Sequence, residues 1–595
     1  MPFFRHSTIH SECSTRHSVT QINNSLLDGN SLSTPARIAW IALILTTLYL
    51  CDFHNLGVIG FVGPDEPRYA WIARDMVESG DWVTPRLYGK PWFEKPILYY
   101  WGAALSFKIF GVSEAAARLP SAIAALLATL AMGWLALRLY GAETARWLLL
   151  LLPTTVGMIG FSHAAATDMP FSGMLTVAMV FAAVILGLVR NDCSPILPRT
   201  PWLALLLFGF FLGLAVLAKG PAAIILSGGT VLVWAFFTKH WRDAFRCLHP
   251  LAVVSFCLTA LPWYVICARR NPDFFRIFII EHNFKRYLTS EFQHIQPFWY
   301  YVSILVIAFV PWTFLLLWSA AFGSLWSWRK KNIPPGTIFL LCWSVFCLSF
   351  FSISKSKLPG YILPAITAIG LLMARSYVRL VPEFESNFRR LCVAWATTMT
   401  LLGLLLWESF GSIRSSTDVA KAGTTEMVVL FMFALANLGF ARKRGLHRAQ
   451  LTTAALCIAP VLLQLCFFGS ISSAFGVDDF YSGRTIARDL GTNHIPPDQL
   501  FYAHMHRGQQ YSLSFYLRKE IQQWDPASPK SGYLLVSSRS CGSLVTAPWV
   551  CSENPIQLES SGWFVYRVDR GDLMSSLGGL DRGGTRFDSG NRQSR

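Results

Sequence analysis

The sequence predicts an all-α polytopic membrane protein with about thirteen transmembrane helices, followed by a small extracytoplasmic α/β domain. Its residues are 53% hydrophobic and only 14% charged, whereas about a quarter of the residues in a soluble domain are charged. Apolar runs recur between residues 37 and 470, and many approach the roughly 20 residues that a helix needs to cross a bilayer. After residue 470 the apolar runs become short, as in strands.

The apolar runs define the expected spans in chain order. Residues 1–36 are polar and rich in Ser and Thr, and we expect a disordered cytoplasmic tail. No small-residue cleavage site follows the first run, which favours a signal anchor over a removed signal peptide. The spans of this transmembrane domain, 37–470, are expected at 37–60, 115–138, 146–162, 169–189, 202–218, 221–238, 248–267, 298–324, 336–353, 359–377, 391–408, 426–441 and 449–470.

The basic residues give the expected orientation. Lys and Arg are concentrated in alternate short loops, such as 329–331 and 442–448, and are rare in the loops between them. The positive-inside rule places the basic loops in the cytoplasm, so the long loops 61–114 and 268–297 and the chain after residue 470 lie outside. This placement explains the net charge of +17 by topology, and we expect no nucleic-acid partner.

Three outer segments have patterns of their own. Apolar residues between Tyr69 and Val77 recur with helical spacing, which predicts a short helix in the membrane interface. Residues 97–110 are apolar but short, and predict a second interfacial or re-entrant helix. Residues 471–572 predict a small α/β domain, and residues 573–595, rich in Gly, Ser and Arg, a disordered tail. The domain's expected elements are a helix from Ser482 with Ile486 and Leu490 on one face, and strands at 499–504, 532–537 and 563–568.

Two carboxylates stand at the outer ends of spans. Asp65 follows the first span in GPDEPRYAW, and Asp168 opens the fourth in AATDMPF. Either residue can cap the helix that begins there, since each precedes a proline by two positions. Either can instead accept a proton from a nucleophilic hydroxyl. The local pattern leaves both interpretations open.

Basic residues on the outer face run against the topological trend. Lys219 sits in LAKGPAA between two spans, and Lys355 and Lys357 sit in SISKSKLPGYILP. They are either lysines whose ammonium groups reach the interface or ligands of an anion, for which a lipid phosphate is the obvious candidate. Glu94 and Lys95 form a charged pair between prolines, and either occupy a solvated turn or contribute to a site.

Metal binding is the weakest of these hypotheses. Glu94 and His282 could form a sparse zinc site that needs water or substrate as further ligands. A lone histidine is usually not a ligand, and nothing in the local sequence demands a metal. No cofactor is therefore required, and Zn or another divalent cation stays an alternative.

Seven sequence blocks occur in an order that is similar to a known family. They are DEPRYAWIARDMVESGDWVTPRLYGKPWFEKPILYYW, ARLPSA, ATDMPF, LAKGP, EHNFKRY, PFWYY and SKSKLPGYILP, within residues 37–470. This arrangement resembles the bacterial aminoarabinose lipid A transferases, relatives of the dolichyl-phosphate-mannose protein mannosyltransferases. The resemblance implies a glycosyltransferase-C fold, an extracytoplasmic active site and an undecaprenyl-phosphate sugar donor. The block EHNFKRYL departs mildly from the family's pattern.

The resemblance also implies roles for individual residues. Asp65 corresponds to the catalytic carboxylate, and Asp168 to a second essential aspartate. The implied donor-phosphate ligands are Arg68, Lys95, Lys219 and Tyr361, and the implied metal or substrate ligands are Glu94 and His282.

The leading hypothesis is therefore a monomeric glycosyltransferase of the bacterial inner membrane, which transfers a sugar from undecaprenyl phosphate to an outer acceptor. The sugar is aminoarabinose or another pentose, and lipid A is the expected acceptor. One alternative is a hexosyl (mannosyl) transferase that acts on protein or an envelope glycan. A lipid or solute transporter is disfavoured, because transporters place polar residues near the midplane, whereas here they gather at one face.

Overall fold

The chain forms two compact units in the computed structural model. The structure describes residues 33–189, 202–285, 296–324, 333–383, 387–388, 390, 481–527, 530–537, 545, 549–552 and 554–570. One unit comprises Met1–Ile59 and Tyr69–Phe475, and the other comprises Gly60–Arg68 and Gly476–Arg595. The short stretch Gly60–Arg68, predicted as the start of the first outer loop, thus packs with the C-terminal part of the chain.

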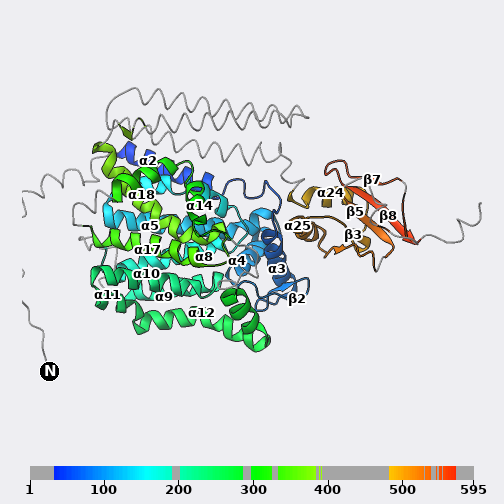
Figure 1. The fold of residues 1–595 in the computed structure, drawn as a ribbon, viewed down its shortest axis with the longest axis horizontal. Helices are drawn as coiled ribbons and strands as arrows, with labels where there is room; N and C mark the ends of the chain where they lie inside the picture. The colour runs from blue at the N-terminus through cyan, green and yellow to red at the C-terminus, as the bar shows by residue number, and fades with distance from the viewer. Residues whose placement is uncertain are drawn as a thin grey trace, which may run out of the picture. The chain divides into compact units, whose positions relative to one another are not determined.

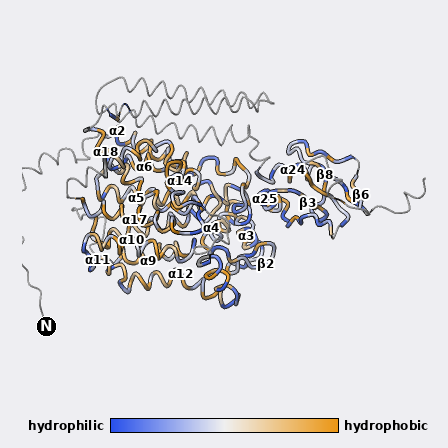
Figure 2. Tube along the Cα trace, viewed as in Figure 1, coloured by the Kyte–Doolittle hydropathy of each residue, from blue (hydrophilic) through white to orange (hydrophobic). Residues whose placement is uncertain are grey.

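The first unit is a bundle of apolar helices (Figure 1). Figure 2 shows hydrophobic residues along most of the bundle helices, as a membrane domain requires. Its helices, in chain order, are α2 (Thr34–Asp52), α3 (Asp65–Ser79, whose first turn belongs to the second unit), α4 (Leu98–Phe110), α5 (Glu114–Tyr140), α6 (Ala142–Leu151), α7 (Val156–Ser162), α8 (Asp168–Ile185), α9 (Trp202–Lys219), α10 (Ala222–Thr238), α11 (Trp241–Phe245), α12 (Pro250–Arg270), α14 (Tyr300–Ala308), α15 (Thr313–Trp318), α17 (Pro335–Ile353) and α18 (Leu363–Glu383). The described part of this unit also contains shorter pieces: η2 (Arg246–Leu248), η3 (Arg276–Lys285), η4 (Ser319–Ser324), η5 (Pro359–Ile362), and a hairpin of β1 (Arg86–Leu87) and β2 (Lys90–Pro91).

Seven of the described helices are long and apolar enough to cross a membrane, or eight if the bent pair α6–α7 counts as one span. The expected spans at 115–138, 169–189, 202–218 and 336–353 are found as α5, α8, α9 and α17. The first expected span, 37–60, is shorter than predicted, because α2 ends at Asp52. The expected spans 391–408, 426–441 and 449–470 lie outside the described residues, as do the terminal segments 1–32 and 571–595.

Two expected spans are broken in the structure. Residues 146–162 form α6 and α7, which are bent by 62° around a break that contains Pro153. Residues 298–324 form α14, α15 and η4, with a turn at Pro311. Proline lacks the N–H that an uninterrupted helix needs, and its ring clashes with the preceding turn. Hydropathy alone does not separate such segments, because the apolar character continues across each break.

Helix α8 is the buried centre of the first unit and carries Asp168 at its start. It packs against α5 and α9, and most of its side chains are buried. A Cβ on Gly173 would lie 2.6 Å from the carbonyl oxygen of Ala124, so glycine lets α8 approach α5 closely. This packing fixes the depth and direction of the helix.

Helices α3 and α4 occur where the apolar patterns predicted them. Tyr69, Ile72, Ala73 and Met76 are all buried, which confirms that they share one face of α3. Val77 is half-buried at the edge of that face. Tyr69 also contacts the rings of two α4 tyrosines, Tyr99 and Tyr100, so the two helices pack together.

In its described residues, the second unit contains a mixed six-stranded sheet and two α-helices. Its elements are α24 (Arg484–Thr492), η7 (Pro497–Gln499), β3 (Leu500–Tyr502), α25 (Arg507–Leu517), β4 (Gln522–Gln523), β5 (Gly532–Val536), β6 (Trp549–Cys551), β7 (Ile556–Gln557) and β8 (Phe564–Arg570). The sheet order is β4-β3-β5-β8-β6, with β7 paired to β8. Strand β3 is parallel to β4 and β5, whereas β5 and β8 are antiparallel. Hydrophobic side chains of the sheet fall into two clusters, one of which contains Ile486 and Leu490 of α24.

Candidate functional site

Asp168 is the first residue of α8 and is held in an ion pair. The preceding Thr167 occupies the N-cap position without a side-chain capping bond. One carboxylate oxygen of Asp168, Oδ1, pairs with the ammonium group of Lys219, the last residue of α9. The positive end of the α8 dipole favours a carboxylate at this position. Only 21% of the Asp168 side chain and 10% of the Lys219 side chain are exposed, so the pair is largely shielded from water.

Tyr361 completes this group. The ammonium nitrogen of Lys219 lies 4.4 Å from the centre of the Tyr361 ring and 5.5 Å from that of Phe171, both within cation–π range. Tyr361 belongs to the short helix η5, which separates α17 from α18. Three of the predicted site residues, which lie far apart in the sequence, therefore meet at the ends of α8 and α9.

Gly360 lets η5 approach Asp168. A Cβ on this glycine would lie 2.5 Å from Asp168 Oδ1 and 2.7 Å from Cε1 of Phe161. Real Cβ atoms do not come so close, so any larger residue would displace the aspartate or η5. The glycine of the LPGY block therefore makes space for the neighbouring carboxylate.

Asp65 lies in the other unit and is arranged differently. It begins α3, and one of its carboxylate oxygens pairs with the Arg68 guanidinium, one helical turn later. The Asp65 side chain is 48% exposed, whereas that of Arg68 is 6% exposed. The Nε–H of Arg68 donates to the carbonyl oxygen of Pro64 at 2.7 Å. A buried arginine thus orients a carboxylate that solvent can reach.

Glu66, next to Asp65, binds the backbone before the helix. Its Oε2 accepts a hydrogen bond from the Val62 N–H at 3.0 Å, and the residue is 7% exposed. The sequence offered capping as one role for Asp65. In the structure Glu66 makes a backbone contact at the start of α3, while the exposed Asp65 carboxylate pairs with Arg68.

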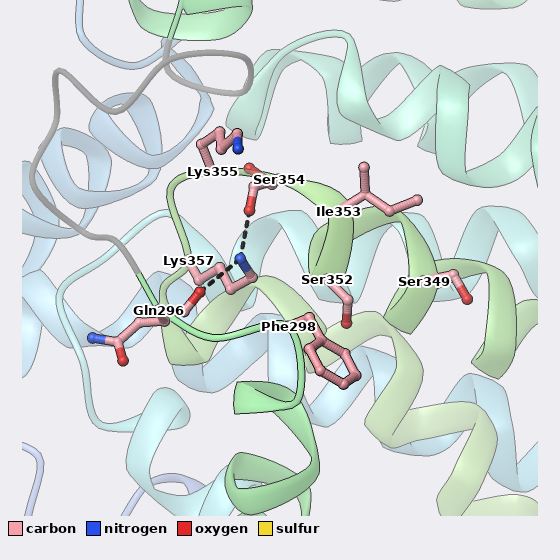
Figure 3. Close-up of a pocket in the computed structure, with 8 residues that line it drawn as sticks. All are labelled: Gln296, Phe298, Ser349, Ser352, Ile353, Ser354, Lys355 and Lys357. Carbon is pink, nitrogen blue, oxygen red and sulfur yellow. Dashed lines mark hydrogen bonds between the residues drawn. The ribbon is translucent and has the colours of Figure 1, made fainter.

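Lys355 and Lys357 line a pocket of about 610 Å³ beside the end of α17 (Figure 3). The ammonium group of Lys357 is buried and donates to the carbonyl oxygens of Ser354, at 2.7 Å, and Gln296, at 3.0 Å. Burial, together with the nearby Lys355 charge, lowers the pKa of Lys357. Lys355 is exposed. An ammonium group has three donors, so Lys357 keeps capacity for a further acceptor.

The apolar side of this pocket is exposed. Phe298 is 79% exposed and Ile353 is 73% exposed, and the serines 349 and 352 lie beside them (Figure 3). Ammonium groups, hydroxyl groups and exposed hydrophobic side chains in one pocket suit an amphipathic anion. The pocket is therefore chemically compatible with a lipid phosphate.

The remaining predicted residues lie in the first unit. Glu94 and Lys95 are half-buried just before α4, and His282 is half-buried in η3. Within the described ranges, no group of three or more His, Cys, Asp or Glu side chains is placed to hold a metal ion. Glu94 and His282 alone would supply fewer than the three protein ligands usual for catalytic zinc.

Helix α25 supplies residues that the sequence patterns did not indicate. Tyr511, Ser512 and Tyr516 contact the stretch Gly60–Arg68, which carries Asp65. Phe61 and Tyr516 are 455 residues apart, so no local periodicity or spacing links them. Paired substitutions in related sequences are the kind of signal that could have revealed such contacts.

Comparisons with known proteins find one family model and several relatives. The family model described as dolichyl-phosphate-mannose-protein mannosyltransferase matches residues 38–278. The undecaprenyl phosphate-alpha-4-amino-4-deoxy-L-arabinose arabinosyl transferase of Aeromonas salmonicida is 33% identical over 399 residues, which cover 66% of this chain and 70% of the relative. The protein of the same name from Edwardsiella ictaluri is 36% identical over 321 residues, 54% of this chain and 56% of the relative.

A solved structure supports the fold. The crystal structure of ArnT from Cupriavidus metallidurans bound to undecaprenyl phosphate superposes with a TM-score of 0.72 at 24% sequence identity. The match covers 89% of this chain and 98% of that one. The fold of this chain is therefore similar to that of ArnT over most of its length.

Proposed function

The chain belongs to the family of undecaprenyl phosphate-alpha-4-amino-4-deoxy-L-arabinose arabinosyl transferases, and we propose that it is a membrane glycosyltransferase with the same class of donor. Its reaction moves aminoarabinose, or another pentose, from undecaprenyl phosphate to lipid A at the periplasmic face of the inner membrane. The single observation that carries this proposal is the 33% identity to the Aeromonas salmonicida enzyme across 70% of that relative. The apolar helices and the bound lipid in the structural relative support it.

The proposed chemistry exchanges one bond for another at the sugar's anomeric carbon. The bond from that carbon to the phosphate oxygen breaks, and a bond to the acceptor oxygen forms. Asp65 takes the proton of the acceptor hydroxyl, a role that its half-exposed carboxylate supports, and Arg68 holds that carboxylate in place. The leaving group is an undecaprenyl phosphate, whose charge basic side chains stabilise.

Lys219 is the proposed principal ligand of the donor phosphate. Its ammonium group already pairs with Asp168 and lies against Tyr361, so an incoming phosphate would share or replace the aspartate as its counter-ion. Asp168 then keeps Lys219 oriented while the site is empty. Arg68 and Lys95 are proposed as further phosphate ligands, together with the pocket residues Lys355 and Lys357.

We propose the finer architecture on the same basis. The membrane domain has about thirteen spans, the C-terminal α/β domain and the loops 61–114 and 268–297 face the periplasm, and the enzyme acts as a monomer. Asp65 and Asp168 are the proposed catalytic carboxylates. The charge distribution of the loops and the family membership support this orientation.

A second candidate function is mannosyl transfer to protein or an envelope glycan. It is favoured by one observation, the match of residues 38–278 to the dolichyl-phosphate-mannose-protein mannosyltransferase family model. The two candidates share the polyprenyl-phosphate donor and differ in sugar and acceptor.

Mass spectrometry separates these candidates. Lipid A and envelope glycans are compared in cells that carry the gene, lack it, or carry an Asp65→Asn variant. A pentose-sized or aminopentose-sized addition to lipid A, present only with the parent protein, supports the leading proposal. A hexose on protein or glycan supports the second candidate. If neither lipid A nor the envelope glycans change with the gene, both candidate functions are contradicted.

A further inference from the structure

Helix α25 binds the backbone of Phe61, four residues before Asp65. The Phe61 N–H donates to the hydroxyl oxygen of Tyr516 at 3.0 Å. The Ser512 hydroxyl donates to the Phe61 carbonyl oxygen at 2.9 Å, and that contact is buried. Two side chains from one face of α25 thus satisfy both backbone polar groups of Phe61.

Apolar packing holds the same loop. Phe61 is fully buried, and its ring meets that of Phe515 edge-on, with 4.8 Å between the ring centres. Gly508 lies so close to Gly63 that a Cβ on it would be 2.9 Å from the Gly63 carbonyl carbon. The loop before Asp65 is therefore fixed against α25 by close packing as well as by hydrogen bonds.

Tyr511 extends these contacts to the catalytic carboxylate. The Arg68 guanidinium lies over the Tyr511 ring, 5.3 Å from its centre. The same guanidinium pairs with Asp65, and its Nε–H donates to the Pro64 carbonyl oxygen. Arg507 also lies over the Tyr511 ring, at 5.4 Å. A contact chain thus runs from Tyr511 through Arg68 to Asp65.

We propose that α25 sets the position of the Asp65 carboxylate, with Tyr511 as the main positioning residue and Tyr516 and Ser512 fixing the loop. This inference rests on the proposed role of Asp65 as the base. It gives the C-terminal unit a part in catalysis, although none of the three α25 residues needs to touch substrate. Misplacing a catalytic group by about 1 Å can cost about a hundredfold in rate, so such positioning has a large kinetic effect.

The kinetic test compares Tyr511→Leu with Tyr511→Phe. Leucine removes the aromatic face under Arg68, whereas phenylalanine keeps it. We expect Tyr511→Leu to lower kcat about tenfold or more, with KM for the donor within about twofold of the parent. Tyr511→Phe should retain most of the parent kcat. Tyr481→Leu, at an exposed tyrosine of the same unit, is the matched control and should behave as the parent.

Hydrogen exchange supplies a readout that does not depend on activity. Tyr516→Phe removes the acceptor of the Phe61 N–H, and exchange in a peptide containing residues 60–68 should accelerate about tenfold or more. The same peptide in Tyr481→Leu should exchange at the parent rate. This conservative variant tests the loop contact even if Tyr511→Leu fails to fold.

The outcomes separate this inference from the proposed function. The role of Tyr511 is overturned if the parent is active and the Tyr511→Leu variant keeps the parent kcat. It is also overturned if Tyr511→Leu lowers kcat no more than Tyr511→Phe does. Unchanged exchange in Tyr516→Phe overturns the loop contact. If the parent transfers no sugar, the proposed function is contradicted. Faster exchange of residues 60–68 in Tyr516→Phe would still show that α25 supports that loop.

Discussion

The ammonium nitrogen of Lys219 lies 4.4 Å from the centre of the Tyr361 ring while it pairs with Asp168. With Phe171 on another side, this cation has one carboxylate and two aromatic rings as neighbours, so it is held in place by a single negative charge. Such a group can exchange a protein carboxylate for a phosphate without losing its position. Two predictions concern this cluster.

Removing the Lys219 charge should weaken donor binding. We expect Lys219→Met to raise the Kd for undecaprenyl phosphate roughly tenfold to a hundredfold, because a hydrogen bond to a charged group is worth about 1.5–3 kcal/mol. Binding to the purified protein in detergent measures this. The control is Lys108→Met, at an exposed lysine near the end of α4, which should bind as the parent does. Equal affinity in Lys219→Met and the parent would remove Lys219 from phosphate recognition.

Adding one methyl group at Gly360 should disturb Asp168. A Cβ there would collide with Asp168 Oδ1 and with the Phe161 ring, so we expect Gly360→Ala to lower the transfer rate about tenfold or more. Gly160→Ala is the matched control, because a Cβ at Gly160 meets nothing within 4 Å. Initial rates of sugar transfer test both variants. Similar rates in the two would show that η5 can shift without consequence.

Neutralising Asp65 should stop the chemistry but not the binding. We expect Asp65→Asn to lower kcat by about two to four orders of magnitude, the usual range for a general base, with donor affinity close to that of the parent. Asp498→Asn changes an exposed carboxylate of the same unit and should keep full activity. Turnover at the parent rate in Asp65→Asn would exclude it as the base.

The buried Lys357 should make stability depend on pH. Its pKa is lowered in the folded protein, so between that value and the ordinary lysine pKa of about 10.4 the unfolded chain binds more protons than the folded one. The contribution of Lys357 to the free energy of unfolding therefore rises with pH between these two pKa values. The thermal midpoint of the parent, relative to Lys357→Met, should increase as the pH rises toward the ordinary lysine pKa of about 10.4. Subtracting the variant cancels other titrating groups, and a flat or falling difference would contradict the shift.

The sequence predicted the fold where apolar runs and helices coincide. Helices α5, α8, α9 and α17 follow their runs closely, since about 20 consecutive apolar residues have few alternatives to a membrane helix. The runs that contain Pro153 and Pro311 were predicted as single spans and are broken. A proline leaves nearby backbone N–H and C=O groups without their helical hydrogen bonds. Whether the apolar helix bends or breaks there depends on which neighbouring groups hydrogen-bond to them instead. The Val156 N–H, for example, donates to the carbonyl oxygen of Val310, far away in sequence.

The candidate site was predictable in part for a related reason. Asp168 and Lys219 are unusual charged residues at the ends of apolar helices, and such residues stand out in a sequence. Tyr361 was indicated only by the family resemblance of its LPGY block. Ser512 and Tyr516 do not, because they look like ordinary residues of an amphipathic helix. Their role depends on a long-range contact with Phe61, which periodicity cannot detect. The catalytic roles of Asp65 and Asp168 stay predictions.

The bonds between Phe61 and α25 also constrain the order in which the enzyme matures. Tyr516 is synthesised 455 residues after Phe61, which takes roughly 20 to 90 seconds at about 5–20 residues per second. During that time the nascent chain inserts its helices with the Asp65 loop still lacking its support. On the proposed role of α25, competence for sugar transfer therefore comes only after the chain has been synthesised as far as Tyr516.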